Sequence, residues 1–259
     1  MTAATAPGSV SAPATAEAAV AGPTIALTAQ EQELFQLLRD VAAAWTRAHP
    51  EHAEPLTLRV AGGWVRDKVL GLPSDDIDIC VNHVSGYDLA LLVQAHLRTS
   101  GGVATSVGKI KANPEKSKNL ETATTRVLGF DVDFAHLRKE QYDAQSRIPV
   151  VAFGTPLEDA ERRDISINAL FYNLHTHAVE DLTGKGLADL AARRIRTPLE
   201  PRQTLHEDPL RALRIIRFAA RFHCTIDDGI TTAMRDPAFQ SLFRVKVSRE
   251  RVGVELTKI

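Results

Sequence analysis

Residues 59–71 read Arg-Val-Ala-Gly-Gly-Trp-Val-Arg-Asp-Lys-Val-Leu-Gly, and residues 76–81 read Asp-Ile-Asp-Ile-Cys-Val. The apolar run before the two glycines predicts a strand over 56–61, and the residues after them predict a helix over 65–70. The second stretch alternates acidic and apolar residues, so a strand there turns its apolar side chains to one face and its two acids to the other. The order strand, glycine turn, helix, strand indicates a mixed α/β unit.

Two acids and two glycines in this stretch point to phosphate chemistry. Asp76 and Asp78, two apart on a strand, lie about 6–7 Å apart, a separation suited to divalent cations such as Mg²⁺. For the two acids taken alone, a solvated strand edge is the favoured interpretation. Gly62 and Gly63 let backbone N–H groups approach a phosphate at a helix start, with Arg66 one turn further on. An ordinary tight turn is the alternative, but the short ordered spacing favours a phosphoryl-transfer site.

Composition excludes several classes of protein. The chain has 259 residues, 44% of them hydrophobic, which is enough for a substantial core. Its 31 Lys and Arg balance 32 Asp and Glu, so any nucleic-acid partner must meet a local basic patch. Cys80 and Cys224 form no CxxC pair, which excludes a disulfide scaffold and suits a reducing compartment. No apolar run is long enough to span a membrane.

Local patterns predict the remaining elements. Residues 1–26, rich in Ala, Thr, Ser, Pro and Gly, predict a disordered tail; a targeting presequence is the alternative, although no Lys or Arg precedes Arg39. His175 and His177 fit a hairpin turn better than a zinc site. The other predicted elements are a helix from Leu27 to His49 capped by Thr28, a helix over 87–98, strands over 103–107, 127–134 and 178–182, a mobile loop over 109–125, and helices from Asp208 onward.

Four ordered motifs resemble the class II tRNA nucleotidyltransferases, the CCA-adding enzymes, and the related bacterial poly(A) polymerases. The first is the stretch quoted above. The others are Arg-Arg-Asp-Ile-Ser-Ile-Asn-Ala-Leu at 162–170, Val-Glu-Asp-Leu-Thr-Gly at 179–184, and Glu-Asp-Pro-Leu-Arg-Ala-Leu-Arg-Ile-Ile-Arg at 207–217. Segments 113–124, 132–138 and 248–255 look like fungal, plant or algal members of the family.

The resemblance implies a fold and a division into domains. It implies an α/β (α+β) nucleotidyltransferase head of the DNA polymerase β-like superfamily, over residues 27–180. An all-α neck with a nucleotide-selecting helix follows over 181–259. Family members continue into further helical body and tail domains, so the chain is expected to correspond to head and neck, with nucleotide binding retained and tRNA binding weakened.

The resemblance also assigns roles around the metal and the triphosphate. Gly62, Gly63 and Arg66 would hold the triphosphate. Asp76 and Asp78 would bind two Mg²⁺ ions. The remaining expected site residues are Asp133 as a third metal ligand, Arg163 and Asp164 at the ribose, and Asn168 as a support for that turn. A buried, satisfied carboxylate is the alternative for Asp133.

The last motif is expected to select the base. Asp208 accepts and Arg211 donates hydrogen bonds, so the pair can match the Watson–Crick edges of cytosine and adenine. Arg214 and Arg217 follow on the same helix, whose dry face is expected at Leu213, Ile216 and Ala220. An exposed Asp–Arg pair without function is the alternative. Eight arginines against three acids over 193–221 make this segment locally basic, and phosphates are its natural counterpart.

These assignments predict template-independent addition of CCA to the 3′ end of tRNA from CTP and ATP, with Mg²⁺ and release of pyrophosphate. The alternatives are an ATP-only poly(A)-adding enzyme and an inactive nucleotide- or RNA-binding module. The expected partners are the tRNA 3′ end, CTP and ATP, with no membrane and no inferable protein partner. The expected location is a reducing intracellular compartment, whether cytoplasm, nucleus or mitochondrion.

Overall fold

The computed structural model describes residues 22–103, 105–110, 122–141 and 149–258. In these ranges seven strands form one sheet in the order β3-β4-β5-β2-β1-β8-β9. Its strands are β1 (Leu58–Ala61), β2 (Ile77–Val81), β3 (Gly108–Ile110), β4 (Thr122–Val127), β5 (Phe130–His136), β8 (Phe171–Asn173) and β9 (Ala178–Glu180). Neighbouring strands are antiparallel except β2 and β5, which are parallel. The predicted mixed sheet is confirmed.

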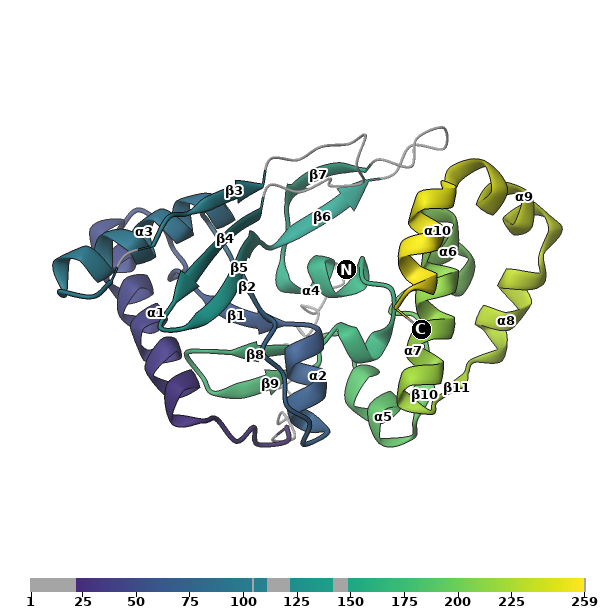
Figure 1. Ribbon diagram of the computed structural model, residues 1–259, viewed down its shortest axis with the longest axis horizontal. Helices are drawn as coiled ribbons and strands as arrows, with labels where there is room; N and C mark the ends of the chain where they lie inside the picture. The colour runs from purple at the N-terminus through teal and green to yellow at the C-terminus, as the bar shows by residue number, and fades with distance from the viewer. Residues whose placement is uncertain (1–21, 104, 111–121, 142–148, 259) are drawn as a thin grey trace, which may run out of the picture.

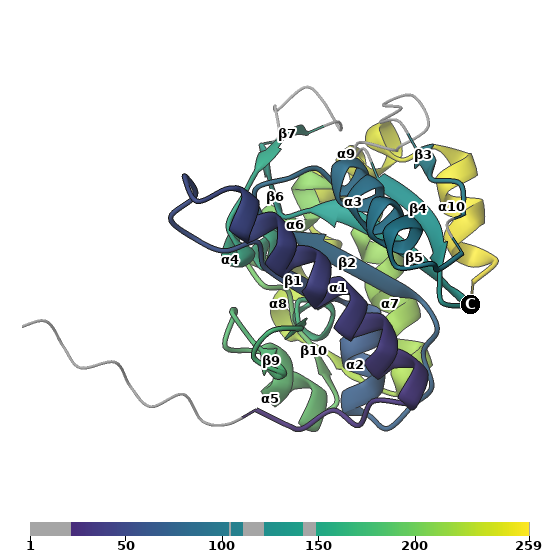
Figure 2. The same ribbon diagram turned by 90° about the vertical axis from the view of Figure 1, so that its left-hand side faces the viewer.

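Two helices, α1 (Ala29–Ala48) and α3 (Gly86–Thr99), cover one face of the sheet (Figures 1 and 2). The predicted Thr28 cap is confirmed, because its hydroxyl accepts from the Glu31 amide and the Glu31 carboxylate accepts from the Thr28 amide, at 3.2 and 2.8 Å. Apolar residues of α1, α3 and the strands form the main core. The helix α2 (Gly63–Val69) packs beside α1, because the Trp64 ring lies edge-on to Phe35 and Lys68 forms an ion pair with Glu31.

The expected alternation along β2 is confirmed. Ile77, Ile79 and Val81 are fully buried, whereas Asp78 is exposed. Before β2, the chain turns from β1 into α2 at Gly62, which has φ of +72°, a conformation that favours glycine. Because β1 and β2 are antiparallel, Gly62 after β1 and the acids at the start of β2 lie at the same end of the sheet.

Four predictions about the strands and the tail are wrong at their boundaries. The described residues 103 and 105–107 lie outside any strand: the Thr105 hydroxyl bonds to the Arg126 carbonyl at 2.8 Å, and ladder pairing begins only at Gly108. β3 and β4 occupy both ends of the predicted 109–125 loop, and residues 111–121 lie outside the described residues. Positive φ at Leu128 and Gly129 turns the predicted 127–134 strand into a hairpin. Residues 1–21 of the tail also lie outside the described residues, but Ile25 packs in the core.

The second half of the described chain is mainly helical, as predicted. Its elements after β9 are α5 (Gly186–Ala191), β10 (Arg194–Ile195), α6 (Pro201–Glu207), α7 (Arg211–Phe222), β11 (Thr225–Ile226), α8 (Asp228–Arg235), α9 (Pro237–Lys246) and α10 (Arg249–Leu256). The expectation of an all-α neck needs one correction, because β10 and β11 pair in parallel. This pairing holds the segment before α6 next to the segment that follows α7.

A small hairpin stands apart from the main sheet. Its strands β6 (Arg138–Gln141) and β7 (Val150–Phe153) pair antiparallel, directly after β5 and before α4 (Pro156–Glu161). Figure 1 shows the hairpin above α4, on the side of the sheet where α6 and α10 lie. A 3-10 turn over Ser166–Asn168 then leads from α4 into β8. The head and the helices thus meet around α4 and this turn.

Candidate active site

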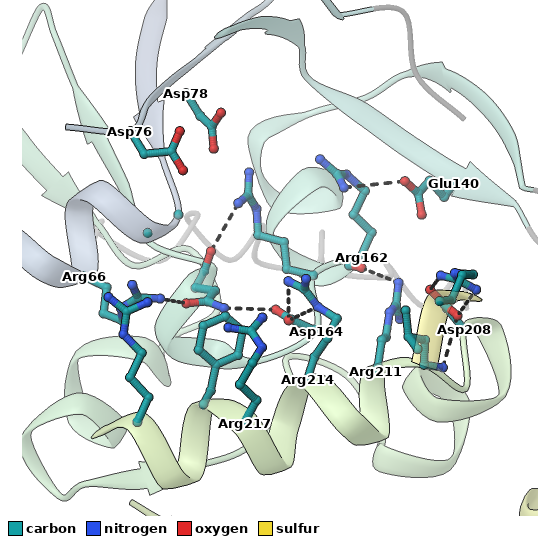
Figure 3. Close-up of a pocket in the computed structure, with 18 of the residues that line it drawn as sticks. Arg66, Asp76, Asp78, Glu140, Arg162, Asp164, Asp208, Arg211, Arg214 and Arg217 are labelled. Carbon is teal, nitrogen blue, oxygen red and sulfur yellow. Dashed lines mark hydrogen bonds and ion pairs between the residues drawn. The ribbon is translucent and has the colours of Figure 1, made fainter. Parts of the chain in front are cut away.

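A pocket of about 520 Å³ lies where these elements meet. Figure 3 shows Asp76 and Asp78 at one end, Asp208 at the other, and Asp164 with Arg214 between them. Nearly all of the predicted site residues line the pocket. They are Gly62, Gly63, Arg66, Asp76, Asp78, Arg163, Asp164, Asn168, Asp208, Arg211, Arg214 and Arg217.

Asp133 is the exception, because it does not line the pocket. Its Cα pairs with that of Asp78 across the parallel strands β2 and β5, so the two residues are direct neighbours. The Thr124 hydroxyl on β4 donates to the Asp133 carboxylate. Within the described ranges, no group of three or more His, Cys, Asp or Glu side chains is arranged to hold a metal ion.

The acidic end fits a cation by its charge. Partial desolvation of the carboxylate in the pocket, followed by the charge of Asp76, raises the pKa of Asp78 to about 6; Arg163 opposes this and Asp133 adds to it. Neighbouring carboxylates destabilise the ionised form of Asp78, and a bound cation would stabilise that form. Mg²⁺ binds one or two protein carboxylates together with substrate phosphates and water, which matches an exposed Asp76 and Asp78 on an open pocket.

Arg66 is held firmly beneath the glycine turn. Its Nε donates to Asp67 at 2.8 Å, and its Nη1 donates to the side-chain carbonyl of Asn168. The guanidinium also lies over the rings of Phe218 and Phe222 on α7, 5.5 and 4.4 Å from their centroids. A cation fixed in this way beside Gly62 and Gly63 suits a phosphate group.

The turn after α4 presents Asp164 to the middle of the pocket. One oxygen of Asp164 accepts from the Ile165 amide at 2.9 Å and the Asn168 side-chain amide at 3.2 Å. The other oxygen accepts from Arg214 at 2.8 Å. Burial raises the pKa of Asp164, but Arg214 and these hydrogen bonds outweigh it and lower the pKa overall. The carboxylate is therefore an ionised acceptor in a fixed position.

At the far end, Arg251 holds Asp208. Its Nη1 and Nη2 donate to the two carboxylate oxygens of Asp208 at 3.1 and 2.7 Å. This end-on pair joins α10 to the start of α7, 43 residues earlier in the chain. Arg251 was not predicted as a site residue, although segment 248–255 carried part of the family resemblance. An ion pair between residues 43 positions apart leaves no periodic pattern in the sequence, so the sequence analysis did not predict it.

Arg211 does not pair with Asp208. Its Nη1 donates to the Glu207 carboxylate at 2.8 Å and the Thr204 carbonyl at 3.0 Å, and its Nη2 donates to the Arg162 carbonyl at 2.7 Å. The guanidinium thus bridges α6, α7 and the end of α4. The exposed Asp–Arg pair considered from sequence is absent from the described part of the chain, since each partner is bound elsewhere.

A second contact from α10 fixes the next arginines of α7. Glu255 is buried, accepts from Arg217 Nε at 2.8 Å and lies 3.7 Å from Arg214 Nη1. Glu255 therefore shares its single negative charge between two arginines that line the pocket.

The predicted dry face of α7 is wrong. Ile216 is 46% exposed, and Ala220 is exposed as well. The buried apolar residues are Ala212, Ile215, Phe218 and Ala219. The helix is rotated because its arginines bind buried acids of α10 and the α4 turn, so charged and apolar residues share the inner surface.

Asp159 on α4 is a buried centre of charge that the sequence analysis missed. It is fully buried and binds Arg162 at 2.6 Å and Arg163 at 2.9 Å. It also accepts from the backbone amide of Arg138 at 3.2 Å. Burial raises the pKa of Asp159, but the arginines outweigh it and lower the pKa to about 2. The spacing of three and four residues to the arginines was the available signal.

The histidines and cysteines lie outside this site. His175 and His177 belong to the β8–β9 hairpin, and His175 Nε2 accepts from the Leu58 amide at 3.2 Å. Cys80 is buried, and burial raises the pKa of its thiol to about 12. In the described ranges, no helix is both long enough and apolar enough to cross a bilayer.

The chain is similar to known nucleotidyltransferases. The sequence profile of the Poly A polymerase head domain matches residues 58–196. The "CCA tRNA nucleotidyltransferase, mitochondrial" of Saccharomyces cerevisiae is 51% identical over 241 residues, covering 92% of this chain and 44% of that protein. A tRNA nucleotidyltransferase of Schizosaccharomyces pombe is 44% identical over 240 residues, covering 91% and 49%. The chain spans less than half the length of these curated relatives.

Solved structures share the fold. An apo CCA-adding enzyme superposes with a TM-score of 0.73 at 25% identity, covering 90% of this chain and 50% of that one. The Thermotoga maritima CCA-adding enzyme, solved in complex with tRNA, superposes with a TM-score of 0.67 at 23% identity, covering 90% and 47%. The superpositions span both the sheet and the helices of the second half.

Proposed function

The chain belongs to the family of the Poly A polymerase head domain, and on this premise we propose that it adds CCA to the 3′ end of tRNA from CTP and ATP. One arrangement carries the proposal: a single pocket has adjacent carboxylates at one end and a fixed Asp208 at the other. The curated relatives, named for tRNA nucleotidyl transfer, support this specificity.

In the proposed reaction, the 3′-hydroxyl oxygen of the RNA bonds to the α-phosphorus of the nucleotide. The bond from that phosphorus to the β-phosphate oxygen breaks, pyrophosphate leaves, and the hydroxyl proton passes to solvent. Asp76 and Asp78 would hold Mg²⁺, with Asp133 supporting Asp78 from the next strand. The bound ions would supply charge stabilisation at the attacking and leaving oxygens.

The other side chains bind and orient the nucleotide. Gly62, Gly63 and Arg66 line the pocket beside the acids and would bind the triphosphate. Asp164, ionised and held by Asn168, would accept from a ribose 2′-hydroxyl, which distinguishes ribonucleotides from deoxyribonucleotides.

Base selection is proposed at the other end of the pocket. Asp208 would accept from the exocyclic amine of cytosine or adenine, and Arg211 would donate to ring acceptors. Both bases offer an amine next to a ring nitrogen, so one donor–acceptor pair suits both. Arg214 and Arg217, which also line the pocket, would help to bind the nucleotide.

A product ladder tests the proposal against its alternatives. The chain is incubated with Mg²⁺, labelled CTP and ATP, and a tRNA that lacks its terminal CCA, and products are resolved to one nucleotide. Addition of C, C and A, followed by a stop, supports the proposal. Repeated addition of A from ATP alone indicates a poly(A)-adding enzyme. Nucleotide binding without addition indicates a binding module.

For the compartment, we propose a reducing one, whether cytoplasm, nucleus or mitochondrion. The free thiols of Cys80 and Cys224 support this. The Saccharomyces cerevisiae relative is named as mitochondrial.

A further inference from the structure

The β6–β7 hairpin exposes an aromatic ring beside the pocket. Phe153 is 53% exposed, and its partner in the ladder is Arg138, which lines the pocket. Directly opposed residues of an antiparallel pair present their side chains to the same face. Phe153 therefore lies on the hairpin face that carries Arg138. Gly154 fixes this pairing, since a Cβ there would lie 2.6 Å from the Arg138 backbone.

The surroundings of Phe153 carry excess positive charge. Three guanidinium groups, those of Arg138, Arg162 and Arg163, share two carboxylates, those of Glu140 and Asp159. Arg138 Nη1 is buried, and no hydrogen-bond partner for it exists in the described structure. The formal charges of these five side chains sum to +1, and a positive charge attracts phosphodiesters.

The hairpin borders the pocket that holds the acids. In an in-line displacement, the attacking oxygen and the leaving pyrophosphate lie on opposite sides of the phosphorus. Arg138 and Glu140 of the hairpin line the same pocket as Asp78, and Figure 3 shows Glu140 away from Arg66, the side chain proposed to bind the triphosphate. β6 also follows directly from β5, the strand of Asp133.

We propose that this hairpin face, Arg138 and Phe153, receives the 3′-terminal nucleotide of the RNA primer, with the terminal base stacked on Phe153. The inference rests on the proposed function, because that function supplies the RNA. An exposed aromatic ring next to a positive groove is the arrangement by which proteins bind single-stranded RNA independently of sequence.

Binding of a short fluorescent single-stranded RNA with a free 3′-hydroxyl tests the proposal by anisotropy, without catalysis. Phe153→Ala is expected to weaken binding about tenfold, the effect of losing one stacked base, whereas Phe153→Trp retains it. Val150→Ala is the matched control, because Val150 is 70% exposed on the opposite face of the same strand. The affinity for CTP should stay unchanged in all three variants.

Several results would overturn the proposal. They are absence of RNA binding by the unmodified chain, unchanged binding by Phe153→Ala, and equal weakening by Val150→Ala. A change of oligomeric state in Phe153→Ala with unchanged RNA affinity would identify a protein interface instead.

The CCA-addition assay described above can distinguish a failure of this proposal from a failure of the proposed function. CCA addition with the same tRNA KM in Phe153→Ala would leave the function standing and reject the hairpin. RNA binding that depends on Phe153, without nucleotide addition, would support the hairpin and reject the function.

Discussion

Arg251 binds both carboxylate oxygens of Asp208, with N–O distances of 3.1 and 2.7 Å. A carboxylate held at both oxygens has one orientation, and its remaining lone pairs face the pocket. Base recognition therefore depends on α10 as well as on the motif at 207–217. Glu255, on the same helix, accepts one hydrogen bond from Arg217 Nε at 2.8 Å.

Arg251→Ala should raise the KM for CTP and for ATP about tenfold, because Asp208 loses its fixed orientation, and a tenfold change corresponds to about 1.4 kcal/mol. Arg251→Lys should recover only part of this, since lysine cannot bind both oxygens. Steady-state kinetics with each nucleotide would measure the effect. Arg249→Ala, an exposed arginine of α10, is the control. Unchanged KM values for Arg251→Ala would show that Asp208 needs no such support.

Asp159→Asn should lower the free energy of unfolding by about 3 kcal/mol, because removal of one partner from a buried ionic network leaves uncompensated charge. Here two arginines, Arg162 and Arg163, lose the negative charge that they share. Urea denaturation would measure the loss. The control Glu161→Gln, at the end of the same helix, should cost less than 1 kcal/mol. A small effect for Asp159→Asn would mean that the arginines find other partners.

Asp78→Asn should make the metal-free chain more stable at pH 8. The folded-state pKa of Asp78 is raised to about 6, above the 3.8 of a free carboxyl, so the folded state binds more protons between these values. Stability should therefore fall as the pH rises from 4 to 6. Asp78 is solvent-exposed, so screening by water reduces the expected gain to about 1 kcal/mol.

The measurement for Asp78 is thermal unfolding in EDTA at pH 4 and pH 8, with and without Mg²⁺. The gain in Asp78→Asn should disappear at pH 4, and Mg²⁺ should raise the Tm of the unmodified chain more than that of the variant. A variant that is less stable than the unmodified chain at pH 8 would contradict the electrostatic account.

Gly62→Ala should destabilise the fold more than Gly71→Ala. Both glycines have φ of +72°, and Gly62 also has ψ of −122°, which lies outside the left-handed region that other residues can adopt. At Gly62 the new Cβ would also meet a side chain, Arg163 Nη1 at 2.9 Å, whereas nothing lies within 4 Å at Gly71. Denaturation of both variants measures the difference. Equal losses would contradict this account.

The local part of the site could be predicted from sequence. A period-two pattern placed Asp78 opposite Ile77 and Ile79, and two glycines placed the turn at Gly62. These signals depend on neighbouring residues only. The role of a residue at the base or ribose came from family resemblance, and stays a prediction.

Contacts between distant segments could not be predicted in this way. The pairs Arg251 with Asp208 and Arg217 with Glu255 join residues 43 and 38 positions apart. The orientation of α7 was wrong for the same reason. Its periodicity was interpreted from apolar residues, whereas buried acids supplied by other elements decide which arginines point inward.

Nucleotide addition by Asp78→Asn tests the central claim, that Asp76 and Asp78 hold the metal ions for the chemistry and the rest of the pocket binds the nucleotide. CTP affinity and CCA addition are measured in parallel for the unmodified chain and the variant, with Mg²⁺ and a tRNA lacking CCA. The account predicts a loss of at least about 1,000-fold in the rate of addition, with CTP affinity within a few-fold. Addition at an undiminished rate by Asp78→Asn would contradict it.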